Sequence, residues 1–289
     1  MNYMLVLTAA LGALDDRSVA AIAAYTGTAP HWLAPGTACE FRVNGPEVVH
    51  DIRGLLKSAP IDANIVPTLN RRKRLLLADM DSTIINCECI DEIADFAGVK
   101  PQISAITERA MRGEIEFESA LRERVALLKG LPESTLAKVY ETRVHLNPGA
   151  KILVRTMAKA QAATALVSGG FTYFTNRVAE AAGFTTNRAN ELGIENGNLN
   201  GTVREPILGR EAKRQALIEL AEQARISLSD TMAIGDGAND LAMIKESGLG
   251  IAYRAKPLVA EAAHARLDHS DLSAALYLQG YRETELVLS

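Results

Sequence analysis

The chain has 289 residues, 48% of them hydrophobic and 23% charged, which is enough for a substantial core and for two domains. Its formal net charge of −4 argues against nucleic acid or an anionic membrane as the main partner. No stretch approaches the roughly 18 uninterrupted apolar residues of a membrane span. The three cysteines lack framework spacing, so we expect a reducing, cytoplasmic location rather than a disulfide-stabilised secreted fold.

Residues 1–70 are predicted to form a small α+β domain. Short apolar runs predict strands, and apolar residues three or four apart predict helices. The order is strand, helix, strand pair, helix, strand, at 3–10, 17–25, 31–43, 46–58 and 63–69. This βαββαβ order resembles ACT domains, which bind amino acids and often pair between chains. Because the segment shows no diagnostic ligand motif, a regulatory role, a homodimer contact and a purely structural role all stay open.

The basic run Arg71-Arg72-Lys73-Arg74 marks the predicted boundary with a second domain at 71–289. Four consecutive cations could form a small patch that binds anions. Directly before a buried strand, however, such a run is more often a solvated linker. We interpret it as a solvated linker.

The second domain is predicted to be α/β with a parallel sheet. Short apolar runs alternate with helical segments, which is typical of βαβ crossovers. In open α/β sheets ligands bind at the carboxyl ends of the strands, so the chemistry is expected there. The predicted strands lie at 75–79, 163–168, 231–236, 249–253 and 265–268.

About 80 residues separate the first two of these strands, far more than the dozen that a minimal crossover needs. Four helical patterns and the glycines at their ends predict an inserted helical unit at about 88–146. Its place in the chain lets it cover the carboxyl edge of the sheet. A smaller stretch at 191–203 contains an Asn-Gly turn signal and predicts a hairpin.

Polar residues gather at the ends of three predicted strands. Asp79 and Asp81 end the first strand, and two carboxylates this close call for a cation or hydrogen bonds to hold them. Ser168-Gly169-Gly170 ends the second strand, Lys213 opens a helix, and "GDGAND" at 235–240 ends the third. The set offers carboxylates for a metal, a hydroxyl and glycine amides for an anion, and a fixed cation, which phosphoryl transfer needs.

These motifs, in this order, resemble those of the haloacid dehalogenase superfamily: "DMDST", the Ser of "LVSGG", a Lys and "GDGAND". The resemblance covers residues 75 to about 268. It implies a Rossmann-like core with a helical-bundle cap and phosphoryl transfer through an aspartyl-phosphate. It implies that Asp79 is the nucleophile and that Asp81 is the general acid and base. Ser168 and Gly169 would contact the phosphate, and Lys213 would balance its charge.

The resemblance also implies a Mg²⁺ cofactor, because attack by a carboxylate on a phosphate ester is repulsive unless a hard cation neutralises both. The expected ligands are the carboxylates of Asp79 and Asp236 and the backbone carbonyl of Asp81. Asp240 is expected to support them without binding the metal directly, and Asn239 to border the phosphate or the substrate.

Two longer stretches, "DMDSTIINCECIDEIA" and "EFESALRERVALLKG", resemble the phosphoserine phosphatases of that superfamily. This implies O-phospho-L-serine as substrate and L-serine and phosphate as products, in the last step of serine biosynthesis. Glu88 would face the ammonium group and Arg124 the carboxylate, with Phe117 and Met111 as apolar cover. Both charged residues lie in charge-rich helical stretches, where ordinary surface pairing is the alternative.

Other functions stay open from the sequence. A related phosphotransferase, or a phosphatase for another small ester, would use the same motifs with a different acceptor or substrate. A regulatory amino-acid-binding protein would not need the complete catalytic set. Cys87-x-Cys89 could be half of a zinc site, but no second Cys/His pair lies at a matching distance.

Overall fold

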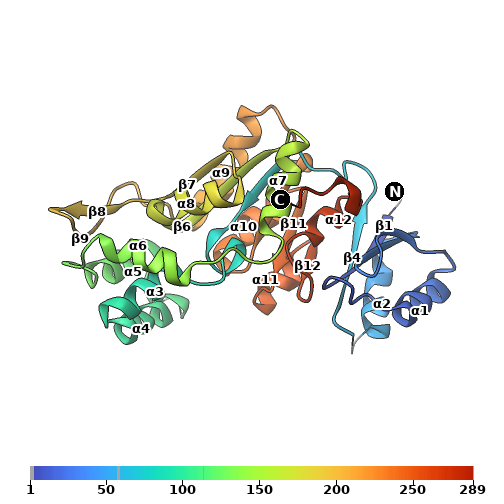
Figure 1. Ribbon diagram of the computed structural model, residues 1–289, viewed down its shortest axis with the longest axis horizontal. Coiled ribbons are helices and arrows are strands. Elements are labelled where there is room, and N and C mark those ends of the chain that lie inside the picture. The colour runs from blue at the N-terminus through green and yellow to red at the C-terminus, as the bar shows by residue number, and fades with distance from the viewer. Residues whose placement is uncertain (1–2, 57–58, 113, 289) are drawn as a thin grey trace.

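The computed structural model describes residues 3–56, 59–112 and 114–288. Within these ranges the first segment forms a four-stranded antiparallel sheet of order β2-β3-β1-β4. The predicted βαββαβ order is therefore present, drawn in blue in Figure 1. Its elements are β1 (Tyr3–Ala9), α1 (Asp16–Thr26), β2 (His31–Ala34), β3 (Ala38–Val43), α2 (Val49–Leu55) and β4 (Ile61–Pro67).

The second sheet is parallel and has six strands in the described residues, in the order β12-β11-β10-β5-β6-β7. All five predicted strands are present. The sixth, β7, was not predicted, because its sequence "TNRAN" is polar and its edge position leaves it half-buried. The bounds are β5 (Leu75–Ala78), β6 (Ala163–Phe171), β7 (Thr186–Asn190), β10 (Thr231–Gly235), β11 (Leu249–Tyr253) and β12 (Ala265–Leu267).

Helices cover both faces of this sheet, which explains why its central strand is wholly apolar. Leu76 and Ala78 of β5 belong to the core cluster that also includes buried residues of α7, α8 and α12, whereas Leu75 and Leu77 pack with α9, α10 and α11. The helices are α7 (Ala150–Lys159), α8 (Thr172–Ala182), α9 (Arg210–Gln223), α10 (Leu241–Glu246), α11 (Pro257–Ala262) and α12 (Ala274–Leu278). No helix among the described residues is long and apolar enough to cross a membrane.

The predicted helical insertion lies between β5 and β6 and extends away from the sheet (Figure 1). The predicted hairpin, β8 (Leu192–Glu195) and β9 (Asn198–Val203), lies against it, and Pro132 forms a bridge with Asn198. The hairpin thus packs on the insertion although it follows β7 in the chain. The inserted helices are α3 (Cys89–Ala97), α4 (Lys100–Met111), α5 (Phe117–Ala126) and α6 (Ser134–Arg143).

The basic run at 71–74 is not a solvated linker, and that interpretation was wrong. Arg71 donates to the carbonyl oxygens of Leu278 and Tyr277 and forms a 2.6 Å ion pair with Glu40 of the first sheet. Lys73 is only 6% exposed, and its Nζ donates to two carbonyl oxygens, those of Asn70 and Ser229, at 2.7 Å each. Arg71 therefore links the first sheet to the α12 region and Lys73 is anchored on backbone carbonyls, whereas Arg72 and Arg74 are exposed.

A second polar contact joins β4 to the edge strand β12. The buried Asn64 side chain donates to Arg266 O at 2.8 Å and accepts from Arg266 N at 2.9 Å, as a neighbouring strand would. The buried Asp62 carboxylate accepts from three consecutive backbone N–H groups just after β12, those of Asp268, His269 and Ser270. The unpaired backbone groups of an edge strand can promote aggregation. Here side chains of the first sheet form hydrogen bonds with those groups of β12.

We predict that Asn64→Ala lowers the free energy of unfolding by roughly 1–3 kcal/mol, because a buried N–H and C=O lose their partners. Urea unfolding measures this value. The matched control is Asn44→Ala, an exposed asparagine of the same segment, which should change stability by less than about 0.5 kcal/mol. Equal losses in both variants would show that the Asn64 contact contributes nothing specific.

Candidate active site

A cavity of about 1050 Å³ lies between the carboxyl edge of the parallel sheet and the inserted helices. Its wall combines residues of β6 and of the loops that follow β5 and β10 with residues of α3, α4, α5 and α9. Lys213 and Asp240 are buried close to the cavity. Met111 is the last residue of α4, and its side chain is not among the parts of the chain that the structure describes. The predicted site residues that line the cavity are Asp79, Asp81, Glu88, Phe117, Arg124, Ser168, Gly169, Asp236 and Asn239.

Asp79 lies at the end of the central strand, where Asp79 N donates to Ile234 O of β10. Its side chain is 6% exposed, and its Oδ1 lies 2.6 Å from Lys213 Nζ, which also donates to Asp240 Oδ1 at 2.6 Å. Burial, and then the charge of Asp240, raises the pKa of Asp79 well above its ordinary value, while Lys213 opposes the shift. Burial alone would lower the pKa of Lys213, but the charges of Asp240 and Asp79 outweigh it and raise that pKa.

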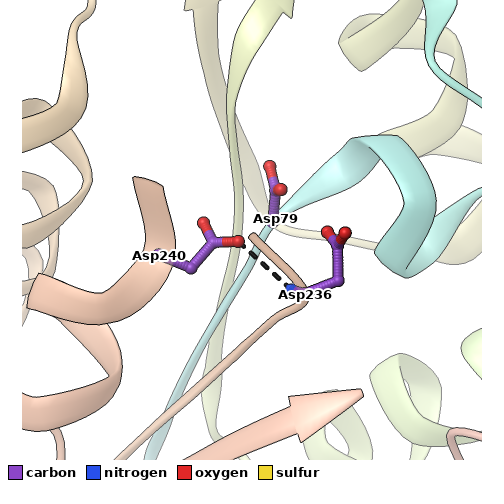
Figure 2. Close-up of side chains that lie close together, drawn as sticks. All are labelled: Asp79, Asp236 and Asp240. Carbon is purple, nitrogen blue, oxygen red and sulfur yellow. Dashed lines mark hydrogen bonds between the residues drawn. The ribbon is translucent and has the colours of Figure 1, made fainter. Parts of the chain in front are cut away.

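Three carboxylates meet at the ends of β5 and β10, and Figure 2 shows them side by side. Asp79, Asp236 and Asp240 each offer an oxygen within 4.8 Å of the others. Asp240 Oδ2 accepts from Asp236 N at 3.2 Å and from Gly237 N at 3.0 Å, which fixes the loop. Burial, and then Asp240, raises the pKa of Asp236 to about 6. One lysine cannot neutralise three carboxylates, so this set of oxygen donors fits a hard divalent cation.

Asp81 is held on both of its carboxylate oxygens. Cys89 N donates to Oδ1 at 2.8 Å, and Ser168 Oγ donates to Oδ2 at 2.9 Å. Burial raises the pKa of Asp81, and the hydrogen bonds from Cys89 and Ser168 oppose this shift. A raised pKa suits a carboxyl group that gives up a proton near neutral pH.

The glycines after Ser168 are required by space. Gly170 N donates to Ser168 Oγ at 2.8 Å, and a Cβ on Gly170 would lie only 2.9 Å from Asp81 Oδ2. A Cβ on Gly169 would lie 3.1 Å from the Phe117 ring, which the inserted helix α5 brings against this loop. Because glycine has no Cβ, the Ser-Gly-Gly backbone can lie close to both the Asp81 carboxylate and the Phe117 ring.

Glu88 and Arg124 form the wall that the inserted helices supply. Solvent reaches Glu88 through the cavity, but the surrounding protein removes bulk water, and this desolvation raises its pKa to about 7, with Asp81 adding to the shift. Burial lowers the pKa of Arg124, and the charges of Asp91 and Glu88 oppose this. Arg124 Nε donates to Ala120 O at 3.2 Å, which directs the guanidinium along α5. A carboxylate and a guanidinium thus face one cavity.

Some residues of the site were not predicted. Thr83 Oγ1 donates to Asp236 Oδ1 at 3.1 Å. This hydrogen bond joins the loop after Asp81 to Asp236, the residue that directly follows β10. Asp91 and Lys256 also line the cavity. The only sequence signal for Thr83 is its place in "DMDST", whereas Lys256 comes from a loop that carries no motif.

The comparisons with known proteins agree with this geometry. Residues 76–245 match the model of the haloacid dehalogenase-like hydrolase family, which is more than half of the chain. The chain belongs to that family. A protein named phosphoserine phosphatase in a Polaromonas species is 48% identical over 210 residues, which cover 71% of this chain and 89% of that protein.

A second relative, named phosphoserine phosphatase in Archaeoglobus fulgidus, is 47% identical over 205 residues. That match covers 71% of this chain but only 59% of the archaeal protein's length. A solved structure described as a phospho-aspartyl intermediate analogue of phosphoserine phosphatase is 40% identical, with a TM-score of 0.66 over 71% of this chain and 98% of its own.

We predict that Lys213→Met lowers the free energy of unfolding by roughly 3–5 kcal/mol at pH 8, because it leaves two buried carboxylates without their cation. At pH 5 the loss should be smaller, because Asp79, whose pKa is raised, can take up a proton and become neutral. Chemical unfolding in a chelator at both pH values measures this. Lys256→Met, an exposed lysine at the same cavity, is the control, and a loss independent of pH would contradict the charge argument.

Proposed function

We propose that this hydrolase is a Mg²⁺-dependent phosphatase that converts O-phospho-L-serine to L-serine and phosphate. The observation that carries the proposal is the single cavity with the carboxylates and Ser168 at one end and Glu88 and Arg124 at the other. A phosphate, an ammonium and a carboxylate on one small molecule match these groups. The names of the relatives support the same substrate.

Asp79 is the nucleophile, and it attacks the phosphorus to form an aspartyl-phosphate. Its carboxylate projects from the end of a buried strand, and Lys213, at 2.6 Å, keeps charge balanced as negative charge moves onto the phosphoryl group. The Ser168 hydroxyl and the Gly169 N–H contact the phosphate oxygens, and Asn239 borders them. The solved analogue of a phospho-aspartyl intermediate supports this route.

Asp81 is the general acid for the serine oxygen as it leaves, and then the base for the water that attacks the aspartyl-phosphate. Its raised pKa keeps a proton available for the first step. Ser168 and the Cys89 N–H orient the two oxygens of its carboxylate. When substrate binds, a phosphate oxygen would accept the hydrogen bond from the Ser168 hydroxyl. Asp81 Oδ2 would then lose this bond and be available for proton transfer.

Asp79, Asp236 and the backbone carbonyl of Asp81 would hold Mg²⁺, with Asp240 fixing the loop that carries Asp236. The bound ion would neutralise the negative charge of the phosphate and of the attacking carboxylate. The excess of carboxylates over the one lysine supports this assignment.

The inserted helices act as a cap that supplies the amino-acid end of the site. Arg124 binds the substrate carboxylate through its planar guanidinium, and Glu88 binds the ammonium. Phe117 closes over Gly169, and Met111 is proposed as further apolar cover. The N-terminal segment is proposed to be an ACT-like regulatory or dimerisation domain, in a protein expected in the cytoplasm.

The test is an assay of phosphate release from a panel of small phosphate esters, with and without Mg²⁺ and with and without alcohol acceptors. A phosphoserine phosphatase should prefer phosphoserine, lose turnover in a chelator, and transfer the phosphoryl group to water rather than to the alcohol. Transfer to alcohols at comparable rates would instead identify a phosphotransferase. Binding of amino acids without turnover would identify a regulatory protein.

Asp79→Asn should abolish turnover, because a neutral amide cannot attack phosphorus. Asp81→Asn should instead leave phosphoserine binding largely intact and lower the rate on the order of 10²–10⁴-fold, because only proton transfer is lost. Steady-state assays with a direct measurement of binding separate the two variants. Wild-type turnover by Asp79→Asn would rule out the covalent route.

Arg124→Ala should weaken phosphoserine binding by roughly 2–5 kcal/mol if it leaves the substrate carboxylate unpaired in the closed cavity. Phosphoethanolamine has no carboxylate, so its binding should barely change. The measurement is the specificity constant for both esters in the wild type and the variant. Arg122→Ala, on the same helix but paired with Glu205 at the surface, is the control. Equal losses on both esters would mean that Arg124 only supports the helix.

A further inference from the structure

Ser82 has an unusual backbone conformation and no part in the roles above. It directly follows Asp81 and lies in the left-handed region, with φ 57° and ψ −3°. This region is uncommon and unfavourable for a residue with a Cβ, and glycine adopts it freely. A serine held here suggests that its hydroxyl is needed.

The hydroxyl has one partner in the described residues. Ser82 Oγ donates to Glu88 Oε1 at 2.6 Å, a short hydrogen bond to a carboxylate. On either side of it, Ser82 N donates to Cys87 O at 3.2 Å and Cys89 N donates to Asp81 Oδ1 at 2.8 Å. Three hydrogen bonds therefore tie residues 81–82 to residues 87–89.

This arrangement spans the two ends of the site. Asp81 belongs to the sheet end, where the phosphate binds, and Glu88 belongs to the insertion, immediately before α3. The two carboxylates repel each other, and without a donor Glu88 would turn away from Asp81. Ser82 is not among the residues that line the cavity, so it acts on a ligand only through Glu88.

We infer that Ser82 is a positioning residue for specificity, which holds the Glu88 carboxylate at a set place relative to Asp81. A small substrate then meets its ammonium partner and its phosphate site at once. The inference rests on the proposed function, and it adds a residue that sets the selection of an ammonium group. It predicts that loss of the hydroxyl weakens recognition of the ammonium and leaves recognition of the phosphate intact.

Ser82→Gly is the main test, because glycine accepts the left-handed backbone without strain and removes only the hydroxyl. The variant should fold with an unfolding temperature equal to or above that of the wild type. Its kcat/KM for phosphoserine should fall roughly tenfold, mainly through KM, as expected for the loss of a charge-assisted hydrogen bond. The inhibition constants of inorganic phosphate and of 3-phosphoglycerate, which carries a hydroxyl in place of the ammonium, should not change.

Four further variants sharpen the result. Gln161→Gly relieves a left-handed residue, φ 62°, on the exposed surface and should leave all kinetic constants unchanged. Ser82→Ala should show the same loss of phosphoserine recognition as Ser82→Gly, but a lower stability than Ser82→Gly, because alanine keeps the strained left-handed backbone. The double variant Ser82→Gly with Glu88→Gln should be no worse than Glu88→Gln alone, because Glu88→Gln already removes the negative charge that Ser82 positions.

A wild-type KM for phosphoserine in Ser82→Gly would overturn the inference, as would equal losses for phosphoserine, phosphate and 3-phosphoglycerate. The wild-type enzyme separates this failure from that of the proposed function. If the wild type shows no preference for phosphoserine over 3-phosphoglycerate, the proposed function is wrong and the role of Ser82 falls with it. If the preference is present but Ser82→Gly keeps it, only the role of Ser82 is wrong.

Discussion

The buried ammonium of Lys213, held between two carboxylates, is the interaction on which the site depends. Parallel pairing of β5 with β10 brings the ends of both strands to one edge, and with them Asp79 and the Asp236–Asp240 loop. Carboxylates crowded in this way are unstable in a folded protein unless they share a cation. Lys213 comes from α9, on the sheet face that packs against Leu75 and Leu77, so the same helix fills the core and neutralises the site.

Lys213 does not neutralise all of the negative charge of the three carboxylates, and the charge that is left favours binding of a further cation. Burial, and then the charge of Asp240, raises the pKa of both Asp79 and Asp236, and Lys213 opposes these shifts without cancelling them. A site that is incompletely neutralised gains free energy when a divalent cation binds. The protein therefore keeps a local instability at the place where we propose that the cation and the phosphate meet, as functional sites commonly do.

The meeting of Asp79, Ser168 and Asp236 at one edge of the sheet could be predicted from the sequence because its signals are local. Asp79, Ser168 and Asp236 each follow an apolar run, and parallel strands place their carboxyl ends together whatever the details of packing. The function of the basic run could not be predicted in this way, because Arg71 binds the carbonyl of Leu278, 207 residues further along the chain. The β7 strand was missed for a similar reason, since only its pairing with β6 makes the polar "TNRAN" a strand.

The docking of the first sheet shows a constraint of the same kind. Asn64 and Asp62 satisfy the backbone of β12 and the residues after it, and both side chains are buried, so this contact fixes orientation more strictly than an apolar face would. The Polaromonas relative is 89% covered by its match, which leaves little length for a domain the size of residues 3–67. In this chain β12 pairs with β11 and β11 pairs with β10, the strand that leads into Asp236. The first sheet therefore completes the edge of the sheet on which the proposed catalytic residues are built, whether or not it also binds a regulatory ligand.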